Sequence, residues 1–280
     1  MQTVQLSSGA IEYLDTGRGP TIVLLHGLAM DGTVWRHVVA DLASEFRCVV
    51  PTMPLGGHRL PVNPQFELSP HSVAMLIGEL LEALDLRDVT LVENDAGRAQ
   101  TFAATLPPRV ARLVLASCEA LDNYPPGLPG KTVALAAQVP GGLNALVQPL
   151  RLRCLRRLPM ALGWMSKRRV PDSVTDGWLH ALLNSRQIRH DLTRYLRAVT
   201  KRDMLDAAAA LPRFDRPALV VWAEEDLVMP IETGRRLAGI LPRGEFVTIR
   251  DSRTLIPEDQ PHELSRLIRD FISRHPVVVS

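Results

Sequence analysis

The chain has 280 residues, of which 46% are hydrophobic and 22% charged, and its formal net charge at pH 7 is +2. These values are typical of a soluble globular protein and allow one large α/β domain, alone or with an inserted subdomain. The sequence has no signal-like amino terminus and no apolar run near the roughly 18 residues of a membrane span, so we expect a cytoplasmic protein. Three scattered cysteines exclude a disulfide framework or a zinc knuckle.

The charge is distributed unevenly along the chain. Residues 121 to 213 contain 15 Lys and Arg but 6 Asp and Glu, a net charge of +9, while the remainder carries −7. A basic segment inside an acidic frame indicates a subdomain of its own.

The first elements alternate between strand and helix patterns. Residues 2 to 14 predict a hairpin with its turn at Ser7-Ser8-Gly9, and the apolar run 21 to 25 predicts a central strand covered on both faces. A loop that begins at His26 follows, with a helix that ends near Leu42. We interpret His26 as a structural turn residue.

The next strand is predicted over residues 46 to 51, and its loop contains His58, which we interpret as bracing the loop. Ser69 and Pro70 then have the residue types of an N-cap and a first helical position. The helix that they open has an apolar stripe that would face a sheet.

Residues 89 to 100 form the most informative stretch of the chain. They read as a short apolar strand, a sharp turn with Asp95 at its apex, and a helix that opens at Gly97 and Arg98. Such a turn presents its apex residue above the carboxyl end of a parallel sheet, close to free helical N–H groups. Glu93 would crowd the turn unless the turn is relaxed or Glu93 has a role of its own.

Further strands are predicted over residues 113 to 118, which end at Glu119, and over 217 to 223 and 245 to 249, before a closing helix that ends near residue 274. The alternation predicts a doubly wound, mostly parallel α/β sheet. Residues 121 to 213 lack strand patterns and predict a helical insertion. The predicted division is a core of residues 1–120 and 214–280 and a cap of residues 121–213.

These motifs resemble the α/β-hydrolase superfamily, in the branch whose nucleophile is Asp. The elbow around Asp95, the His26-Gly27 pair and an acid loop with Asp226 carry the resemblance, which covers residues 4 to 274 apart from the cap. It implies that the insertion caps the active site, and that Asp95 attacks carbon to form an alkyl ester that activated water then hydrolyses.

The resemblance also implies further site residues. The backbone N–H groups of Leu28 and Ala96 would form an oxyanion hole, and Asp226 or Glu119 would supply the acid of the triad. The usual His position after the last strand is most simply Thr254, whose hydroxyl is no general base near neutral pH.

Other histidines could replace the missing base only from a distance. His262 should face away from the site, while His180 and His190 belong to the cap and would need to swing over Asp95. Neighbouring carboxyl groups could instead perform the acid–base catalysis, because two like charges at close range raise the pKa of one of the groups.

The sequence contains few motifs that identify the substrate class. A dehalogenase of this type has Trp after the nucleophile, where Ala96 stands, whereas the cap tyrosines Tyr124 and Tyr195 favour the epoxide type slightly. Glu93 and Trp35 are further candidate substrate contacts. We expect hydrolysis of a small, mostly apolar epoxide, halide or ester. The alternatives are an impaired small-molecule-binding member and a His-independent lyase or isomerase.

Partners and cofactors are weakly indicated. The run 148 to 158 interleaves Arg with Leu, which is compatible with an anionic membrane surface or an acidic partner, but favours a cap helix with its apolar face over the active site and a solvated basic face. No nucleic-acid-binding motif accompanies the charge, so we expect a small-molecule substrate and no nucleic acid. No cofactor or metal is indicated, and the oligomeric state stays open.

Overall fold

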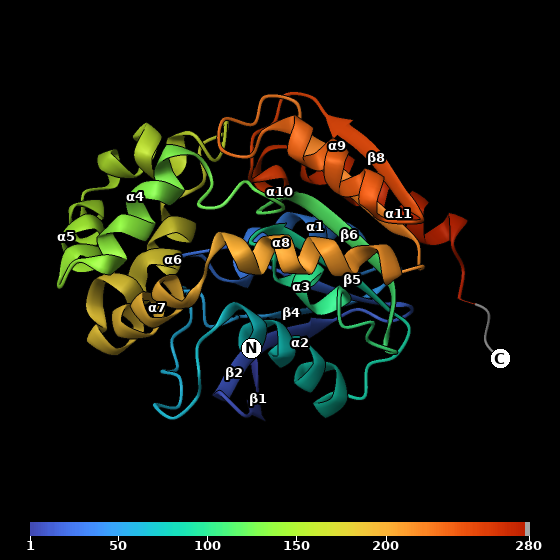
Figure 1. Cartoon of the computed structure of the whole chain (residues 1–280), viewed down its shortest axis with the longest axis horizontal. Helices are drawn as coiled ribbons and strands as arrows, with labels where there is room; N and C mark the ends of the chain where they lie inside the picture. Colours follow the sequence, from blue (N-terminus) through green and yellow to red (C-terminus); the bar gives the residue numbers. More distant parts are fainter. Residues whose placement is uncertain (278–280) are drawn as a thin grey trace.

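A sheet of eight strands runs through the middle of the molecule in the computed structural model, which describes residues 1–277 (Figure 1). The strands are β1 (Gln2–Leu6), β2 (Gly9–Thr16), β3 (Thr21–Leu25), β4 (Arg47–Pro51), β5 (Val89–Asp95), β6 (Val110–Cys118), β7 (Ala218–Ala223) and β8 (Gly244–Ile249). Their spatial order is β1-β2-β4-β3-β5-β6-β7-β8. Only the pairs β1–β2 and β2–β4 are antiparallel, which confirms the doubly wound, mostly parallel sheet.

Helices cover both faces of this sheet. They are η1 (Gly32–Trp35), α1 (Arg36–Leu42), α2 (Pro70–Ala83), α3 (Arg98–Ala103), α4 (Gly127–Gln138), α5 (Gly142–Val147), η2 (Gln148–Arg151), η3 (Arg153–Arg157), η4 (Pro159–Gly163), α6 (Asp172–Asn184), α7 (Arg186–Ala198), α8 (Lys201–Ala210), η5 (Leu211–Arg213), α9 (Ile231–Ile240), α10 (Ile256–Asp259) and α11 (Pro261–Arg274). Within residues 1–277, no helix is both long and apolar enough to cross a membrane.

The central strands are apolar on both faces because each face is covered. In β3, Ile22 and Leu24 pack into one cluster with residues of α1 and α11, while Val23 and Leu25 pack into a second cluster with residues of α2 and α3. Alternate side chains of a strand point to opposite faces, so a continuous apolar run is what two buried faces require. The helix α2 begins as its sequence predicts, with the Ser69 hydroxyl accepting from the N–H of Ser72 and Pro70 in the first turn.

Residues 121–213 contain helices and loops without a strand. In Figure 1, helices α4 to α7 gather at one end of the sheet, and α8 leads back along the core, where it contacts α3. The helical insertion is therefore present, while its treatment as a separate cap domain with those limits stays a prediction.

The Arg- and Leu-rich run of the insertion does not form the amphipathic cap helix that its sequence suggests. Residues 148–158 form two short 3₁₀ helices, η2 and η3. Leu152 and Leu158 are 61% and 50% exposed, while Arg156 is 5% exposed. Pro149 and the irregular π-helical turn that starts at Pro159 limit regular helix here, so the prediction of one amphipathic helix is wrong, although Leu150 of this run does line the cavity described below.

Candidate active site

The strand order brings five loops together at the carboxyl edge of the sheet. Strands β3, β5, β6, β7 and β8 are consecutive neighbours and parallel. Their carboxyl ends therefore meet at one edge, the usual place of ligand sites in open α/β sheets. The residues predicted for the site follow these strands, namely Leu28, Asp95, Glu119, Asp226 and Thr254.

Asp95 lies in a sharp turn between β5 and α3. Its φ is 76°, in the left-handed region that non-glycine residues rarely adopt, and strain of this kind is typical of functional sites. The backbone N–H of Leu28 donates to Asp95 Oδ2 at 3.0 Å. A Cβ at Gly27 would lie 2.0 Å from that same oxygen, so glycine at position 27 makes room for the carboxylate.

The predicted oxyanion hole is only half present around Asp95. The Leu28 amide reaches the carboxylate, whereas the Ala96 amide donates to the carbonyl of Asn94 at 3.0 Å. One oxygen of Asp95 therefore already occupies the place that the Leu28 N–H offers to a developing negative charge.

Glu93 has a structural role and does not contact the cavity. Its side chain is fully buried, and its two carboxylate oxygens accept from the backbone N–H groups of Arg98 and Ala99 at 2.8 and 2.7 Å. The carboxyl group thus caps the amino terminus of α3 from within the preceding strand, satisfying two N–H groups that a helix leaves unpaired. Burial raises the pKa of Glu93 to about 8, opposed by Arg98 and by the two N–H groups. The prediction that Glu93 contacts substrate is wrong because the helix start takes up both of its oxygens.

Glu119 stands beside Asp95 at the end of β6. Its backbone N–H donates to the carbonyl of Asp95 at 2.9 Å, and its side chain is 15% exposed. Behind it lies Arg98, whose guanidinium is 1% exposed, with Nη2 3.4 Å from Glu119 Oε2 and its centre 5.6 Å from the ring centroid of Tyr195.

Arg98 is a residue of the site that sequence reasoning did not assign. Its signal was a charged residue directly after the elbow glycine, on a helix that must pack against the sheet. Charged residues are rarely fully buried without a partner, so an arginine at position 98 predicts an acidic side chain nearby.

Asp226 is hydrogen-bonded to Thr254, because the two residues follow the neighbouring strands β7 and β8. The Thr254 hydroxyl donates to Asp226 Oδ1 at 2.7 Å, and the backbone N–H groups of Val228 and Met229 donate to the same oxygen. Thr254 is fully buried, so its hydroxyl fills the space beside the acid without facing the cavity.

The chain has eight histidines, all within the described residues, and none of them lines the cavity at Asp95. His26 is buried, with Nε2 accepting from the Met53 N–H and Nδ1 beside the Gly27 carbonyl, which fits a structural turn residue. His58 lies between the Gly56 N–H and Asp191 of α7, so it braces its loop.

The remaining candidate bases lie at the surface. His180 and His190 are exposed, and the side chain of His262 is 84% exposed and pairs with Asp41. The structure therefore brings no imidazole to Asp95.

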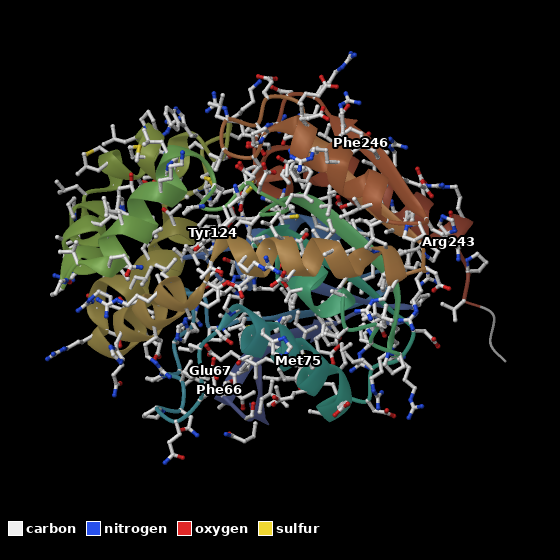
Figure 2. All side chains as sticks on the ribbon, viewed as in Figure 1. Phe66, Glu67, Met75, Tyr124, Arg243 and Phe246 are labelled. Carbon is white, nitrogen blue, oxygen red and sulfur yellow. The ribbon has the colours of Figure 1, made fainter. Side chains whose placement is uncertain are left out.

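An apolar cavity of about 170 Å³ lies over the two carboxyl groups. Asp95 and Glu119 line it together with Tyr124 and with mostly apolar side chains from the helical insertion. Figure 2 shows Tyr124 where the helices α4 to α7 meet the core. The lining consists of Leu28, Ala29, Met30, Asp95, Glu119, Tyr124, Pro125, Pro126, Pro129, Gly130, Val133, Leu150, Arg156, Met160, Ala161, Leu162, Met165, Trp178, Leu179, Leu196 and Val228.

Two other candidate substrate contacts lie outside this cavity. Trp35 is fully buried in the core cluster that contains α1 and α11. Tyr195 is 2% exposed and packs against Arg98. Tyr124 alone of the candidate aromatic contacts lines the cavity.

Burial raises the pKa of all three carboxyl groups of the site. It raises the pKa of Asp95 to about 7, helped by the Asp226 carboxylate and opposed by the Leu28 N–H. Burial also raises the pKa of Glu119 to about 7, opposed by Arg98 and helped by Asp95. The pKa of Asp226 is raised by burial too. Two neighbouring acids whose pKa lies near neutral pH can each be present in either protonation state, which is what acid–base catalysis requires.

Comparison with known proteins places these features in a family. The family model described as alpha/beta hydrolase fold matches residues 20–261. The cis-3-alkyl-4-alkyloxetan-2-one decarboxylase of Xanthomonas campestris pv. campestris is 26% identical, and the match covers 96% of this chain and 94% of that protein. A non-heme chloroperoxidase of Kitasatospora aureofaciens is also 26% identical, with 94% and 96% of the two chains covered.

Solved structures show the same fold. A reconstructed ancestral haloalkane dehalogenase superposes with a TM-score of 0.78 at 19% identity, covering 98% of this chain and 99% of its own. A thermophilic esterase from Thermogutta terrifontis gives a TM-score of 0.72 at 20% identity, covering 99% and 100%. The family and its named relatives support a hydrolase, without identifying the reaction.

Proposed function

Because this chain belongs to the alpha/beta hydrolase fold family, we propose that it is an enzyme that hydrolyses a small, mostly apolar epoxide, with Asp95 as the nucleophile. The observation that carries the proposal is the setting of Asp95. One of its oxygens is held by the Leu28 N–H at 3.0 Å, and its side chain lines an apolar cavity together with Glu119.

The occupied amide favours attack by Asp95 on a saturated carbon. A substrate ester would need the Leu28 N–H for its own oxyanion, but Asp95 Oδ2 already accepts from it. When Asp95 itself becomes an ester, the oxyanion of the following step forms on Asp95, at the atom that this N–H already contacts.

The polar groups of the cavity favour an epoxide over a halide. The only tryptophan among the described lining residues, Trp178, donates its Nε1–H to Thr33 Oγ1 at 2.8 Å, so it does not offer this N–H to a leaving halide. Tyr124, whose hydroxyl can donate to an epoxide oxygen, lines the cavity. The relative named as an oxetanone decarboxylase supports a strained oxygen-containing ring as the electrophile.

Glu119 supplies the acid and then the base in this scheme. Ionised Asp95 attacks a ring carbon, the ring C–O bond breaks, and the protonated carboxyl of Glu119 gives its proton to the leaving oxygen. The resulting Glu119 carboxylate then takes a proton from a water molecule, whose oxygen attacks the Asp95 ester carbonyl. The tetrahedral intermediate breaks the C–O bond to the alkoxide, which takes the proton of the newly formed Asp95 carboxylic acid and leaves as the diol. The pKa of about 7 for each carboxyl allows both protonation states at neutral pH.

Isotope labelling tests the role of Asp95. In a single turnover in H₂¹⁸O, an Asp95 ester releases a diol that contains no ¹⁸O, because the added oxygen comes from the carboxylate. The variant Asp95→Asn should form neither diol nor protein adduct, while Asp122→Asn, which changes an exposed carboxylate paired with Arg236, should behave as wild type. A first-turnover diol that carries ¹⁸O would make Asp95 a general base instead.

The missing imidazole favours a second candidate, a member that binds a ligand under its cap without turnover. Tight binding of an epoxide analogue with no diol and no mass adduct would support it. A product formed by elimination or rearrangement, again without an adduct, would instead support a lyase or isomerase in which Asp95 moves a proton.

A further inference from the structure

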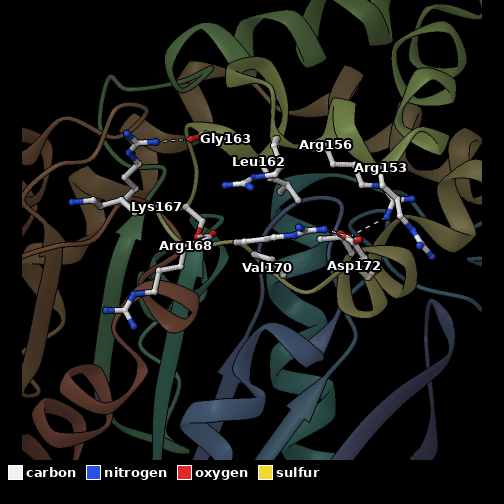
Figure 3. A pocket seen from close by; sticks show the side chains of 13 residues that line it. Arg153, Arg156, Leu162, Gly163, Lys167, Arg168, Val170 and Asp172 are labelled. Carbon is white, nitrogen blue, oxygen red and sulfur yellow. Dashed lines mark hydrogen bonds and ion pairs between the residues drawn. The ribbon is translucent and has the colours of Figure 1, made fainter.

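A second pocket, of about 180 Å³, is lined mainly by basic side chains (Figure 3). We call it the basic pocket. Its lining consists of Arg153, Arg156, Arg157, Leu162, Gly163, Ser166, Lys167, Arg168, Arg169, Val170, Asp172, Thr175 and Arg253. Seven of these residues are cationic and one is anionic, and all but Arg253 come from the helical insertion.

Neighbouring acids neutralise this charge only in part. The acids paired with the lining cations are Asp172, Asp176, Glu225 and Asp251. Among the described residues, Arg157 and Arg253 have no ion-pair partner. With Asp259, whose carboxylate lies in the wall of the pocket, five acids stand against seven cations and leave an excess positive charge of two.

The walls of the basic pocket are held in place by the fold. Arg156 is 5% exposed and is fixed by the Leu150 carbonyl, Thr175 and Asp176. On the other side, the carboxylate of Asp259 accepts from the Ser166 hydroxyl and from the backbone N–H groups of residues 167, 168 and 253. Side chains that are already ordered lose less entropy when a ligand binds.

The basic pocket adjoins the apolar cavity over Asp95. Arg156 and Leu162 line both. The short turn η4 lies between the two spaces, since Met160 and Ala161 line the cavity while Gly163 lines the basic pocket. The two spaces therefore share a wall made of Arg156, Leu162 and the turn η4.

We propose that the basic pocket binds the phosphate head of an amphiphile whose short apolar part, carrying the reactive ring, enters the cavity. The inference rests on the proposed function and names its substrate class. Several arginines around one small space match the geometry and charge of phosphate. The phosphate belongs to a free amphiphile or to a lipid in a bilayer, and we commit to the free amphiphile.

Direct binding tests the basic pocket without any turnover. Pyrophosphate should bind the wild-type protein in calorimetry, more weakly as salt increases. The double variant Arg157→Glu/Arg168→Glu, which changes two exposed arginines of the lining, should weaken binding at least about tenfold. The control Arg186→Glu/Arg213→Glu makes the same charge change at exposed arginines outside the lining and should bind as wild type. Equal weakening in both variants, or no binding by wild type, would overturn the site.

A matched substrate pair tests the substrate class. We expect an epoxide with a terminal phosphate to show at least about tenfold higher kcat/KM than the same epoxide with a terminal hydroxyl, and the lining variant to remove this preference through KM. Equal kcat/KM for both substrates would overturn the inference while the proposed function stands. Pyrophosphate binding without turnover or adduct for either substrate would overturn the proposed function, and with it the reactive ring of the proposed ligand, while the phosphate-binding role of the basic pocket stands.

Vesicles distinguish the two sources of phosphate. The protein should not sediment with phosphatidylglycerol vesicles more than with phosphatidylcholine vesicles. Sedimentation with the anionic vesicles alone, lost in the lining variant, would assign the basic pocket to a bilayer surface and overturn the free amphiphile.

Discussion

Two adjoining carboxyl groups, Asp95 and Glu119, set the chemistry that this site can perform. Both line the apolar cavity, and burial raises the pKa of each to about 7. At the place beside Asp226 where an imidazole would be expected, the Thr254 hydroxyl donates to the acid at 2.7 Å. A hydroxyl at this place can hold Asp226 but cannot take a proton from water near neutral pH.

Replacing Glu119 should separate the two chemical steps. In Glu119→Gln, ring opening loses its acid and ester hydrolysis loses its base, so the test uses an epoxide whose leaving oxygen is stabilised enough for Asp95 to open the ring without a proton donor. We expect the alkyl ester on Asp95 to persist, with its hydrolysis slowed roughly 10²–10⁴-fold, as measured by intact-protein mass spectrometry over time. Unchanged breakdown of the adduct in this variant would remove Glu119 from the base role.

At the scale of elements, the turn between β5 and α3 depends on a capping contact from inside the strand. The side chain of Glu93, in β5, accepts from the backbone N–H groups of Arg98 and Ala99. Glu93 thereby helps to hold the start of α3 next to Asp95, whose φ is 76°.

The variant Glu93→Gln tests this contact. A glutamine side chain has one acceptor oxygen and one NH₂ group, so one helical N–H would face a donor. We expect the free energy of unfolding to fall by about 1–3 kcal/mol in urea titrations, with a matching loss of turnover. The same change at the exposed Glu82 of α2 should leave stability unchanged, and equal stability of Glu93→Gln and wild type would refute the capping role.

At the scale of the whole molecule, the buried carboxyl groups link stability to pH. The folded pKa, raised by burial, is about 7 for Asp95 and Glu119 and about 8 for Glu93, above the ordinary values of 3.8 for Asp and 4.5 for Glu. Between those values and about pH 7, the folded state therefore binds more protons than the unfolded state, and stability falls as pH rises.

We expect the free energy of unfolding, measured in urea titrations, to decrease between pH 5 and pH 7.5, by up to about 1.4 kcal/mol per pH unit for each carboxyl group that is protonated only in the folded state. Asp95→Asn removes one of the groups and should flatten the curve. In Asp122→Asn the curve should keep its shape, since the pKa of Asp122 is already lowered by Arg236 and lies below this window. Stability that rises with pH across this range would contradict the raised pKa values.

Much of the fold was predictable because it follows from local patterns. Continuous apolar runs predicted the central strands, Ser69 and Pro70 predicted the start of α2, and the break in rhythm after Glu119 predicted the helical insertion. The Arg- and Leu-rich run was mispredicted because its pattern does not reveal which side chains tertiary packing buries: Arg156 lies inside and Leu152 outside.

By itself, the sequence determined the α/β class, the elbow with Asp95 at its apex and the absence of histidine near the last strand, because these depend on residue type and spacing along the chain. The tertiary structure alone decided the rest. Only strand order places Leu28 and Glu119 beside Asp95, only packing turns Glu93 and Arg98 inward, and only the fold of the insertion sets a basic pocket against an apolar one. These are contacts between segments far apart in sequence, which local spacing does not encode.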